Sequence, residues 1–127
     1  MYWKDKLKQK VMENIEYATS LYPDFKGTTD EEMFNQFSLA CMQAVNYFDS
    51  LAVLVLEEKK HKEPLSYLEV IDELYKMKIL PKTAVPKLKR LFHLRNLYAH
   101  KRYMVNDKDL EEMFNLLKIV ENAVNKM

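Results

Sequence analysis

The scarcity of glycine is the feature that most constrains how this chain folds, because Gly27 is the only glycine among its 127 residues. Glycine-rich phosphate loops, dinucleotide-binding fingerprints and sets of tight β-hairpins need glycines at positions that other residues tolerate poorly. The sequence therefore excludes these sites and architectures, and abundant Leu, Lys, Glu and Met favour helices instead. Apolar residues make up 48% of the chain, enough for a hydrophobic core. The length predicts one domain spanning residues 1–127.

Apolar residues recur at helical spacing in five stretches, and no stretch alternates with the two-residue period of a β-strand. The second stretch carries the widest apolar stripe, so we expect it to pack against several neighbours at the centre. The sequence predicts an all-α fold, a five-helix up-and-down bundle. The expected helices run from about Trp3 to Leu21, Asp30 to His61, Ser66 to Pro81, Thr83 to His100, and from Asn106 or Asp107 to the end.

Short-range signals predict where these helices begin and end. Pro23 and Gly27 are expected to end the first helix. Ser66 followed by Glu69 forms the S-x-x-E pattern of a capping box at the start of the third helix, and Pro81 is expected to end it. The buried side of that third helix is predicted to consist of Leu68, Ile71, Leu74 and Tyr75.

The single cysteine, Cys41, rules out an intrachain disulfide and a multi-cysteine metal site. It lies in an apolar helical pattern, so we interpret it as a buried structural thiol. The longest unbroken apolar run, Leu51 to Leu56, is too short to span a bilayer. The lysine-rich N-terminus has no following apolar segment of signal-peptide length. We therefore expect a cytoplasmic protein without a membrane partner.

Charge is distributed unevenly along the chain, although the formal net charge is only +1. From Leu74 to Asn106 there are nine Lys or Arg residues and no Asp or Glu. Such a segregated basic segment indicates a polyanionic partner. A solvated lysine-rich face explains the same composition, and both interpretations stay open at this point.

In the fourth helix an arginine occupies a position where the apolar pattern calls for a hydrophobic side chain. Leu91 and Phe92 are followed one turn later by Arg95. A charge directed into a bundle is costly unless it is paired or functional. Arg95 is therefore either an edge arginine paired to a carboxylate such as Asp49 or Asp72, or a phosphate-binding group, since its planar fork matches phosphate oxygens.

His100 follows Arg95 by five residues and can move a proton near neutral pH. In a regular helix five residues correspond to about 500°, so the two side chains point roughly 140° apart. They can converge only if the helix frays near His100 or if two copies of the protein face each other. A histidine at a helix end can also serve only to interact with the helix dipole.

The remaining polar candidates carry weaker signals. His61 and His93 do not form a metal-binding spacing with His100, and two histidines without a carboxylate make a poor zinc site. Neither a metal nor a cofactor is expected. Asp49, with Asn46 one turn before it, either reaches the same pocket or forms a satisfied polar pair in the core.

The segment Arg95-Asn96-Leu97-Tyr98-Ala99-His100 resembles the R-x4-H motif of HEPN domains, and its R-N start resembles the HepT branch of that superfamily. Four other features sit where HepT-like proteins have corresponding ones. They are the long second helix, the stretch Pro64–Tyr67, the Leu80–Pro81 break and the Asn106–Asp107 start of the last helix. The resemblance covers the chain well from about Asp30 to the C-terminus and the first helix loosely.

The resemblance implies an α-helical bundle that acts as a metal-independent endoribonuclease, with two protomers bringing their motifs together. It implies that Arg95 holds the scissile phosphate, that His100 acts as general base or acid, and that Asn96 orients one of them. HepT-like proteins usually act as toxins beside a small nucleotidyltransferase antitoxin, which in some of them adenylylates a tyrosine just after the motif. The implied partners are RNA, a second copy of the chain (a homodimer) and such a nucleotidyltransferase.

The sequence departs from the family pattern just after the motif. The family's tyrosine comes two residues after the histidine, a position held here by Arg102, and Tyr103 follows one residue later. Arg102 and Tyr103 are still expected at the substrate, and Tyr103 is the candidate for modification. Tyr98 lies one turn from Arg95 and either stacks on a base or packs in the core.

Two alternatives to a ribonuclease toxin stay open from the sequence. One is a non-catalytic HEPN-like binding subunit of a nucleotidyltransferase, which keeps the fold and the basic residues but does not cleave RNA. The other is a helical interaction module with no link to nucleic acid.

Overall fold

The structure describes residues 2–58, 66–101 and 106–127. These residues form five helices joined by turns and loops, and they contain no strand. The structure is a computed structural model of the whole chain. The predicted all-α five-helix bundle is confirmed. The helices are α1 (Tyr2–Phe25), α2 (Glu31–Glu58), α3 (Tyr67–Lys76), α4 (Ala84–Lys101) and α5 (Asp107–Asn125).

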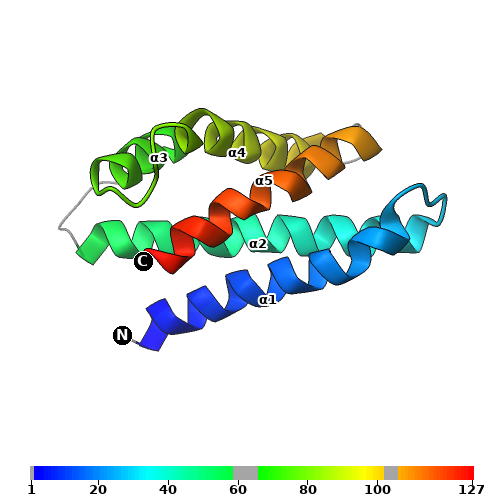
Figure 1. Cartoon of the computed structure of the whole chain (residues 1–127), viewed down its shortest axis with the longest axis horizontal. Coiled ribbons are helices and arrows are strands. Elements are labelled where there is room, and N and C mark those ends of the chain that lie inside the picture. Colours follow the sequence, from blue (N-terminus) through cyan, green and yellow to red (C-terminus); the bar gives the residue numbers. More distant parts are fainter. Residues whose placement is uncertain (1, 59–65, 102–105) are drawn as a thin grey trace.

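Helix α2 lies at the centre of the bundle and contacts each of the other four helices. In Figure 1, α1 runs antiparallel along one side of α2, α5 crosses in front of it, and α3 and α4 cover the opposite side. This central position confirms the prediction from the wide apolar stripe. The fully or almost fully buried residues of the stripe are Phe37, Cys41, Ala44, Phe48, Leu51 and Val55.

Cys41 is buried in this interior, as predicted for a structural thiol, and burial raises the pKa of its thiol because the charged form loses its hydration. Within the described ranges, α2 is also the one helix long and apolar enough to cross a membrane. Of its most apolar window, 56% is buried inside the bundle. A central helix of a globular bundle meets the same criterion, because it is apolar on several sides.

Helix α1 continues past the proline that was predicted to end it. Pro23 lies in its last turn, and the helix ends at Phe25. A proline there fits the helical φ angle and removes only one backbone hydrogen bond. Phe25 is almost fully buried and stacks on Phe37 of α2, with ring centroids 4.2 Å apart. The burial of this side chain favours the extra turn, so the chain reverses only at Gly27, whose φ is 78°.

Helix α3 begins with the predicted capping box, and its buried face matches the predicted one only in part. The Ser66 side chain accepts a hydrogen bond from the Glu69 backbone N–H, and the Glu69 side chain accepts one from the Ser66 backbone N–H. The prediction that Leu68 and Tyr75 are buried is wrong, because their side chains are 43% and 44% exposed. The predicted burial of Ile71 and Leu74 is confirmed, and the third buried residue of α3 is Val70, which was not predicted.

The prediction that Pro81 ends α3 is wrong, because the helix ends at Lys76 in a backbone turn. The N–H of Ile79 donates to the carbonyl oxygen of Leu74 at 3.0 Å, and the N–H of Lys78 donates to that of Tyr75 at 2.9 Å. These are the two hydrogen bonds of a Schellman motif. Its left-handed position is held by Lys78, with a φ of 62°. This residue turns the chain away from the helix axis well before Pro81.

Helices α4 and α5 form the hairpin that carries the motif. Helix α4 begins at Ala84 and carries Pro86 in its first turn, where the missing N–H is harmless. Helix α5 begins after Asn106, whose side chain accepts a hydrogen bond from the Asp109 backbone N–H at 2.8 Å, the predicted N-cap. Its inward face consists of Leu110, Met113, Leu117, Val120 and Val124 together with the half-buried Phe114, and packs in the core.

Candidate functional site

Helix α4 places Arg95 at the edge of the core. Its apolar face consists of Leu88, Leu91, Phe92 and Leu94, all fully buried. The next position on that face is Arg95, whose side chain is 13% exposed. Its Cζ atom lies 4.8 Å from the centroid of the Phe92 ring, a geometry in which the ring face attracts the cation. Because Arg95 continues the apolar face of α4, its guanidinium lies at the boundary between core and solvent.

Three polar side chains hold the Arg95 guanidinium. Its Nε donates to Oδ1 of Asn96 at 2.8 Å, and its Nη1 donates to Oδ1 of Asn46 at 3.0 Å. Nη1 also lies 3.6 Å from Oδ2 of Asp49 on α2. Of the two carboxylates predicted as partners, Asp49 is thus the one that pairs with Arg95. Asp72 pairs with Lys89 instead, at 3.2 Å.

Asn46 and Asp49 were predicted either to reach the pocket or to form a polar pair in the core. The structure brings both of them to Arg95, with Asn46 exposed and Asp49 34% exposed. They lie one turn apart on α2, so their side chains share one face and reach the same guanidinium. The interpretation as a core pair is therefore wrong, because this face of α2 borders solvent.

One nitrogen of the Arg95 fork stays available. No hydrogen bond or ion pair joins Nη2 to any described residue. The described neighbouring groups orient the guanidinium through Nε and Nη1 and engage none of the N–H groups of Nη2. A guanidinium held in this way can still donate hydrogen bonds to an anion.

His100 lies on a different side of α4 from Arg95. The helix stays continuous to Lys101, so five regular residues separate the two side chains. His100 is exposed and lines a shallow hollow of about 160 Å³ together with His93, Asn96 and Leu97. Of the two ways in which Arg95 and His100 could converge, fraying of the helix near His100 is therefore not seen.

Asn96 connects the two sides of the helix. Its Oδ1 accepts the hydrogen bond from Arg95, and its side chain lines the hollow that contains His100. The spacing of His93, Asn96, Leu97 and His100 places all four on one outward face, as expected for residues three, four and seven apart. Leu97 and His93 were not predicted as members of the site, although this helical spacing could have identified them.

The other predicted site residues have varied positions. Arg102 and Tyr103 lie outside the described residues, as does His61. The hydroxyl groups of Tyr98 and the fully buried Ser38 are hydrogen-bonded at 2.7 Å, so Tyr98 packs against the core rather than facing the hollow. No group of three or more His, Cys, Asp or Glu side chains capable of holding a metal ion occurs in residues 2–58, 66–101 and 106–127.

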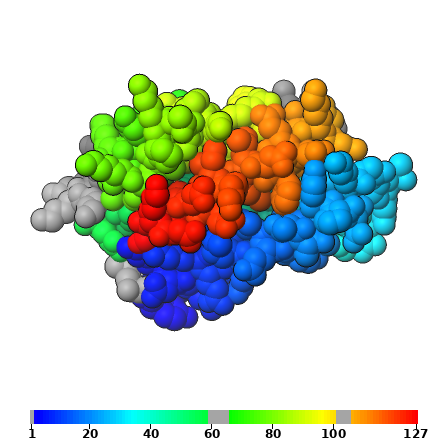
Figure 2. Space-filling view, viewed as in Figure 1, coloured from blue at the N-terminus to red at the C-terminus, as the bar shows by residue number. Residues whose placement is uncertain are grey.

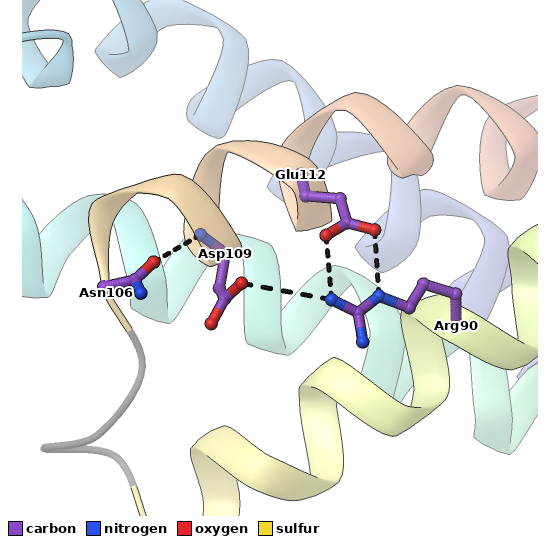
Figure 3. Close-up of polar contacts among 4 residues, drawn as sticks. All are labelled: Arg90, Asn106, Asp109 and Glu112. Atoms are coloured by element: carbon purple, nitrogen blue, oxygen red, sulfur yellow. Dashed lines mark hydrogen bonds and ion pairs between the residues drawn. The ribbon is translucent and has the colours of Figure 1, made fainter.

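The basic segment does not form one continuous positive surface. Arg90 donates two hydrogen bonds to Glu112, from Nε at 2.9 Å and from Nη2 at 3.0 Å, and its Nη2 lies 3.9 Å from Asp109 (Figure 3). The hydrogen bonds lower the pKa of the Glu112 carboxyl and raise that of Arg90. Carboxylates on α2, α3 and α5 thus pair with Arg95, Lys89 and Arg90. These carboxylates lie outside the segment from Leu74 to Asn106, so the sequence of that segment alone did not indicate that its charges are paired.

Comparison of the chain with protein-family models, curated proteins and solved structures gives no match.

Proposed function

We propose that this protein is a cytoplasmic, metal-independent endoribonuclease of the HEPN type. It works as a homodimer and cleaves RNA through Arg95 and His100. One observation carries the proposal. Three polar side chains hold Arg95 at the core edge, its Nη2 has no partner among the described residues, and Asn96 links it to the exposed face that contains His93 and His100. Oriented guanidinium groups stabilise phosphates, and an accessible imidazole transfers protons near neutral pH.

A second copy of the chain explains how the two catalytic groups meet. Within one protomer α4 is regular, so Arg95 and His100 diverge. A two-fold contact between α4 helices brings Arg95 of one copy toward His100 of the other. Exposed leucines beside the motif support such a contact, since Leu39 on α2 is 56% exposed and Leu97 on α4 is 37% exposed. Large exposed apolar side chains are common at protein interfaces.

In the proposed reaction, His100 removes the proton from a ribose 2′-hydroxyl, and the resulting oxygen forms a bond to the adjacent phosphorus. The bond between phosphorus and the 5′-oxygen breaks, and that oxygen leaves with a proton from solvent. Arg95 stabilises the negative charge that develops on the phosphate oxygens. The products are a 2′,3′-cyclic phosphate end and a 5′-hydroxyl end.

The biological role that goes with this chemistry is a toxin controlled by a small nucleotidyltransferase antitoxin. This part of the proposal rests on the resemblance of the Arg95–His100 segment to HepT-like proteins. Asn96 orients the Arg95 fork, Arg102 and Tyr103 contact the RNA, and Tyr103 is the tyrosine available for modification. A non-catalytic binding subunit is the alternative that the following experiment separates from a ribonuclease.

The test is cleavage of a defined single-stranded RNA by the purified full chain in EDTA, beside the variants Arg95→Ala, Arg95→Lys and His100→Ala. The parent should yield cyclic phosphate ends. Loss of the fork or of the imidazole should each reduce the rate roughly 100-fold or more. Arg95→Lys should also fail, because an ammonium cannot reproduce the planar fork.

Arg90→Ala is the matched control, because it removes an exposed arginine from the same helix and should keep cleavage. Circular dichroism and size-exclusion chromatography establish that each variant folds and keeps its oligomeric state. Equal cleavage by all variants would contradict the assigned site. A parent that cleaves no RNA would favour the binding subunit.

A further inference from the structure

A groove on another side of the molecule carries an inference that does not depend on RNA cleavage. Two adjoining hollows, each of about 410 Å³, lie where the loop between α3 and α4 meets the C-terminal end of α5. Both are lined by Leu80, Pro81 and Lys126, so they form one groove, named here the lysine groove. In Figure 2 it lies where the green surface of α3 and the following loop meets the red end of α5. None of its lining residues belongs to the hollow around His100.

The lysine groove combines an apolar floor with a basic rim. The aliphatic side chains along its floor come from the loop, α4 and α5: Ile79, Leu80, Ala84, Ile119 and Ala123. Its rim carries four lysines, Lys76, Lys78, Lys87 and Lys126, and none of the described lining residues is acidic. The neighbouring hollow between α4 and α5 differs, because Glu111 and Glu112 line it. The absence of carboxylates is therefore a property of this groove and not of the whole surface.

Three of the four rim lysines have no ion pair with any described residue. Lys76 pairs with Glu73 at 3.1 Å. No ion pair joins Lys78, Lys87 or Lys126 to another residue of the described part of the chain. Lys89 and Arg90 of the acid-free segment pair with carboxylates of other helices, whereas Lys78 and Lys87 of the same segment line the groove without an ion pair to a described residue.

Lys78 adds a second observation, because it occupies a backbone position that suits glycine. It holds the left-handed residue of the Schellman motif, with a φ of 62°. Glycine is the usual residue there, since a Cβ atom makes this conformation unfavourable. Strained residues cluster at functional sites. The backbone of the turn favours glycine at this position, but the chain has a lysine there, and its side chain lines the groove.

We propose that the lysine groove binds an acidic segment of a partner protein that inserts an apolar side chain between its carboxylates. The aliphatic floor accepts the apolar side chain, the rim lysines pair with the flanking carboxylates, and the carboxamides of Asn122 and Asn125 can pair with the backbone of the segment. Charge complementarity thus selects the occupant.

Nucleic acid fits this groove less well. Among the described residues that line it there is no arginine, and Tyr75, at one end, is the one aromatic residue. Single-stranded nucleic acid is usually held by successive aromatic stacking platforms along a basic channel. Here the floor is aliphatic, which suits a leucine or isoleucine side chain better than a sugar–phosphate backbone.

The test uses the full-length, isotope-labelled chain and three labelled probes in turn. The first is a peptide of about twelve residues with glutamates flanking leucines, the motif length typical of groove-binding segments. The second replaces every leucine by serine, and the third is a single-stranded RNA of matched length. Fluorescence anisotropy measures affinity, and amide chemical-shift changes show where each probe binds.

The charge-reversal variant Lys87→Glu with Lys126→Glu should weaken the leucine peptide roughly tenfold or more. Its matched control is Lys6→Glu with Lys26→Glu, which makes the same change in net charge at exposed positions on and after α1 and should bind as the parent does. Lys78→Gly should lower affinity roughly two- to threefold, the effect of one exposed charge pair, without unfolding the turn. The shifts should centre on Ala84, Asn122 and Ala123.

The proposal is overturned if the peptide binds the groove variant and the parent equally, if its shifts lie elsewhere, or if it does not bind. If the serine peptide binds as tightly as the leucine peptide, the proposed insertion of an apolar side chain into the groove is contradicted. Binding of RNA alone at these residues assigns the groove to nucleic acid instead. RNA cleavage should be unchanged in both double variants, so failure here is distinguishable from failure of the proposed ribonuclease.

Discussion

At the scale of single residues, the physical cost of burying charge organises the candidate site. Arg95 is carried to the core edge by the apolar face of α4, and Asn96, Asn46 and Asp49 then satisfy most of its fork. A guanidinium with a partly exposed carboxylate partner avoids the penalty of an unpaired buried charge. Nη2 has no partner among the described residues, and it is the N–H donor that the proposed phosphate contact uses.

Lys78 yields a prediction about stability that complements its place in the lysine groove. Lys78→Gly should raise the free energy of unfolding by roughly 1 kcal/mol, because glycine adopts a positive φ without strain. Urea unfolding measures this change. Lys78→Ala is the control: it removes the same charge but keeps a Cβ atom, and should give no comparable gain. A gain from alanine as large as that from glycine would show that the charge, and not the backbone, causes the strain.

At the scale of the helices, the sequence predicted most of the elements but not their exact faces and ends. The five helices, the central α2, the capping box at Ser66 and the N-cap at Asn106 follow from periodicity and local hydrogen-bonding groups. The extra turn of α1 depends on a distant contact, the stacking of Phe25 on Phe37. The end of α3 depends on a left-handed lysine, which no composition rule indicates.

The faces of α3 show the same limit. Leu68 and Tyr75 fit a helical pattern as well as Val70 does, and only the positions of α2 and α4 decide which of them is buried. At the candidate site, the apolar pattern and the position of His100 predicted Arg95, His100 and the two possible carboxylates, and the resemblance to HEPN domains added Asn96. The choice of Asp49 over Asp72 required knowing that α2 lies opposite Arg95 while α3 lies opposite Lys89.

The capping box of α3 gives a prediction at this scale. Ser66→Ala removes the acceptor for the Glu69 backbone N–H and should lower the free energy of unfolding by about 1 kcal/mol. Ser50→Ala, at an exposed position within α2, is the matched control and should be neutral or slightly stabilising, because alanine is the better helix former. Equal effects of the two substitutions in urea unfolding would contradict a specific capping contribution.

At the scale of the whole molecule, charge compensation between helices divides the basic segment into separate surfaces. Lys89 and Arg90 are paired, Arg95 lies at the motif, and Lys78 and Lys87 line the groove. The protein therefore presents two distinct candidate surfaces on different sides of α4. The motif face carries the exposed Leu97 and the diverging side chains of Arg95 and His100, and a second copy of the chain is its proposed complement.

The most direct test of this account is complementation between two inactive variants. Arg95→Ala and His100→Ala chains carry different tags, are co-expressed, and the dimer that contains one of each is purified and assayed for RNA cleavage in EDTA. If Arg95 of one copy works with His100 of the other, one of the two sites in this mixed dimer is intact. It should then recover about half the activity of the parent dimer, whereas each variant alone stays inert. A mixed dimer as inactive as the two variants, beside an active parent, would contradict a site shared between two copies.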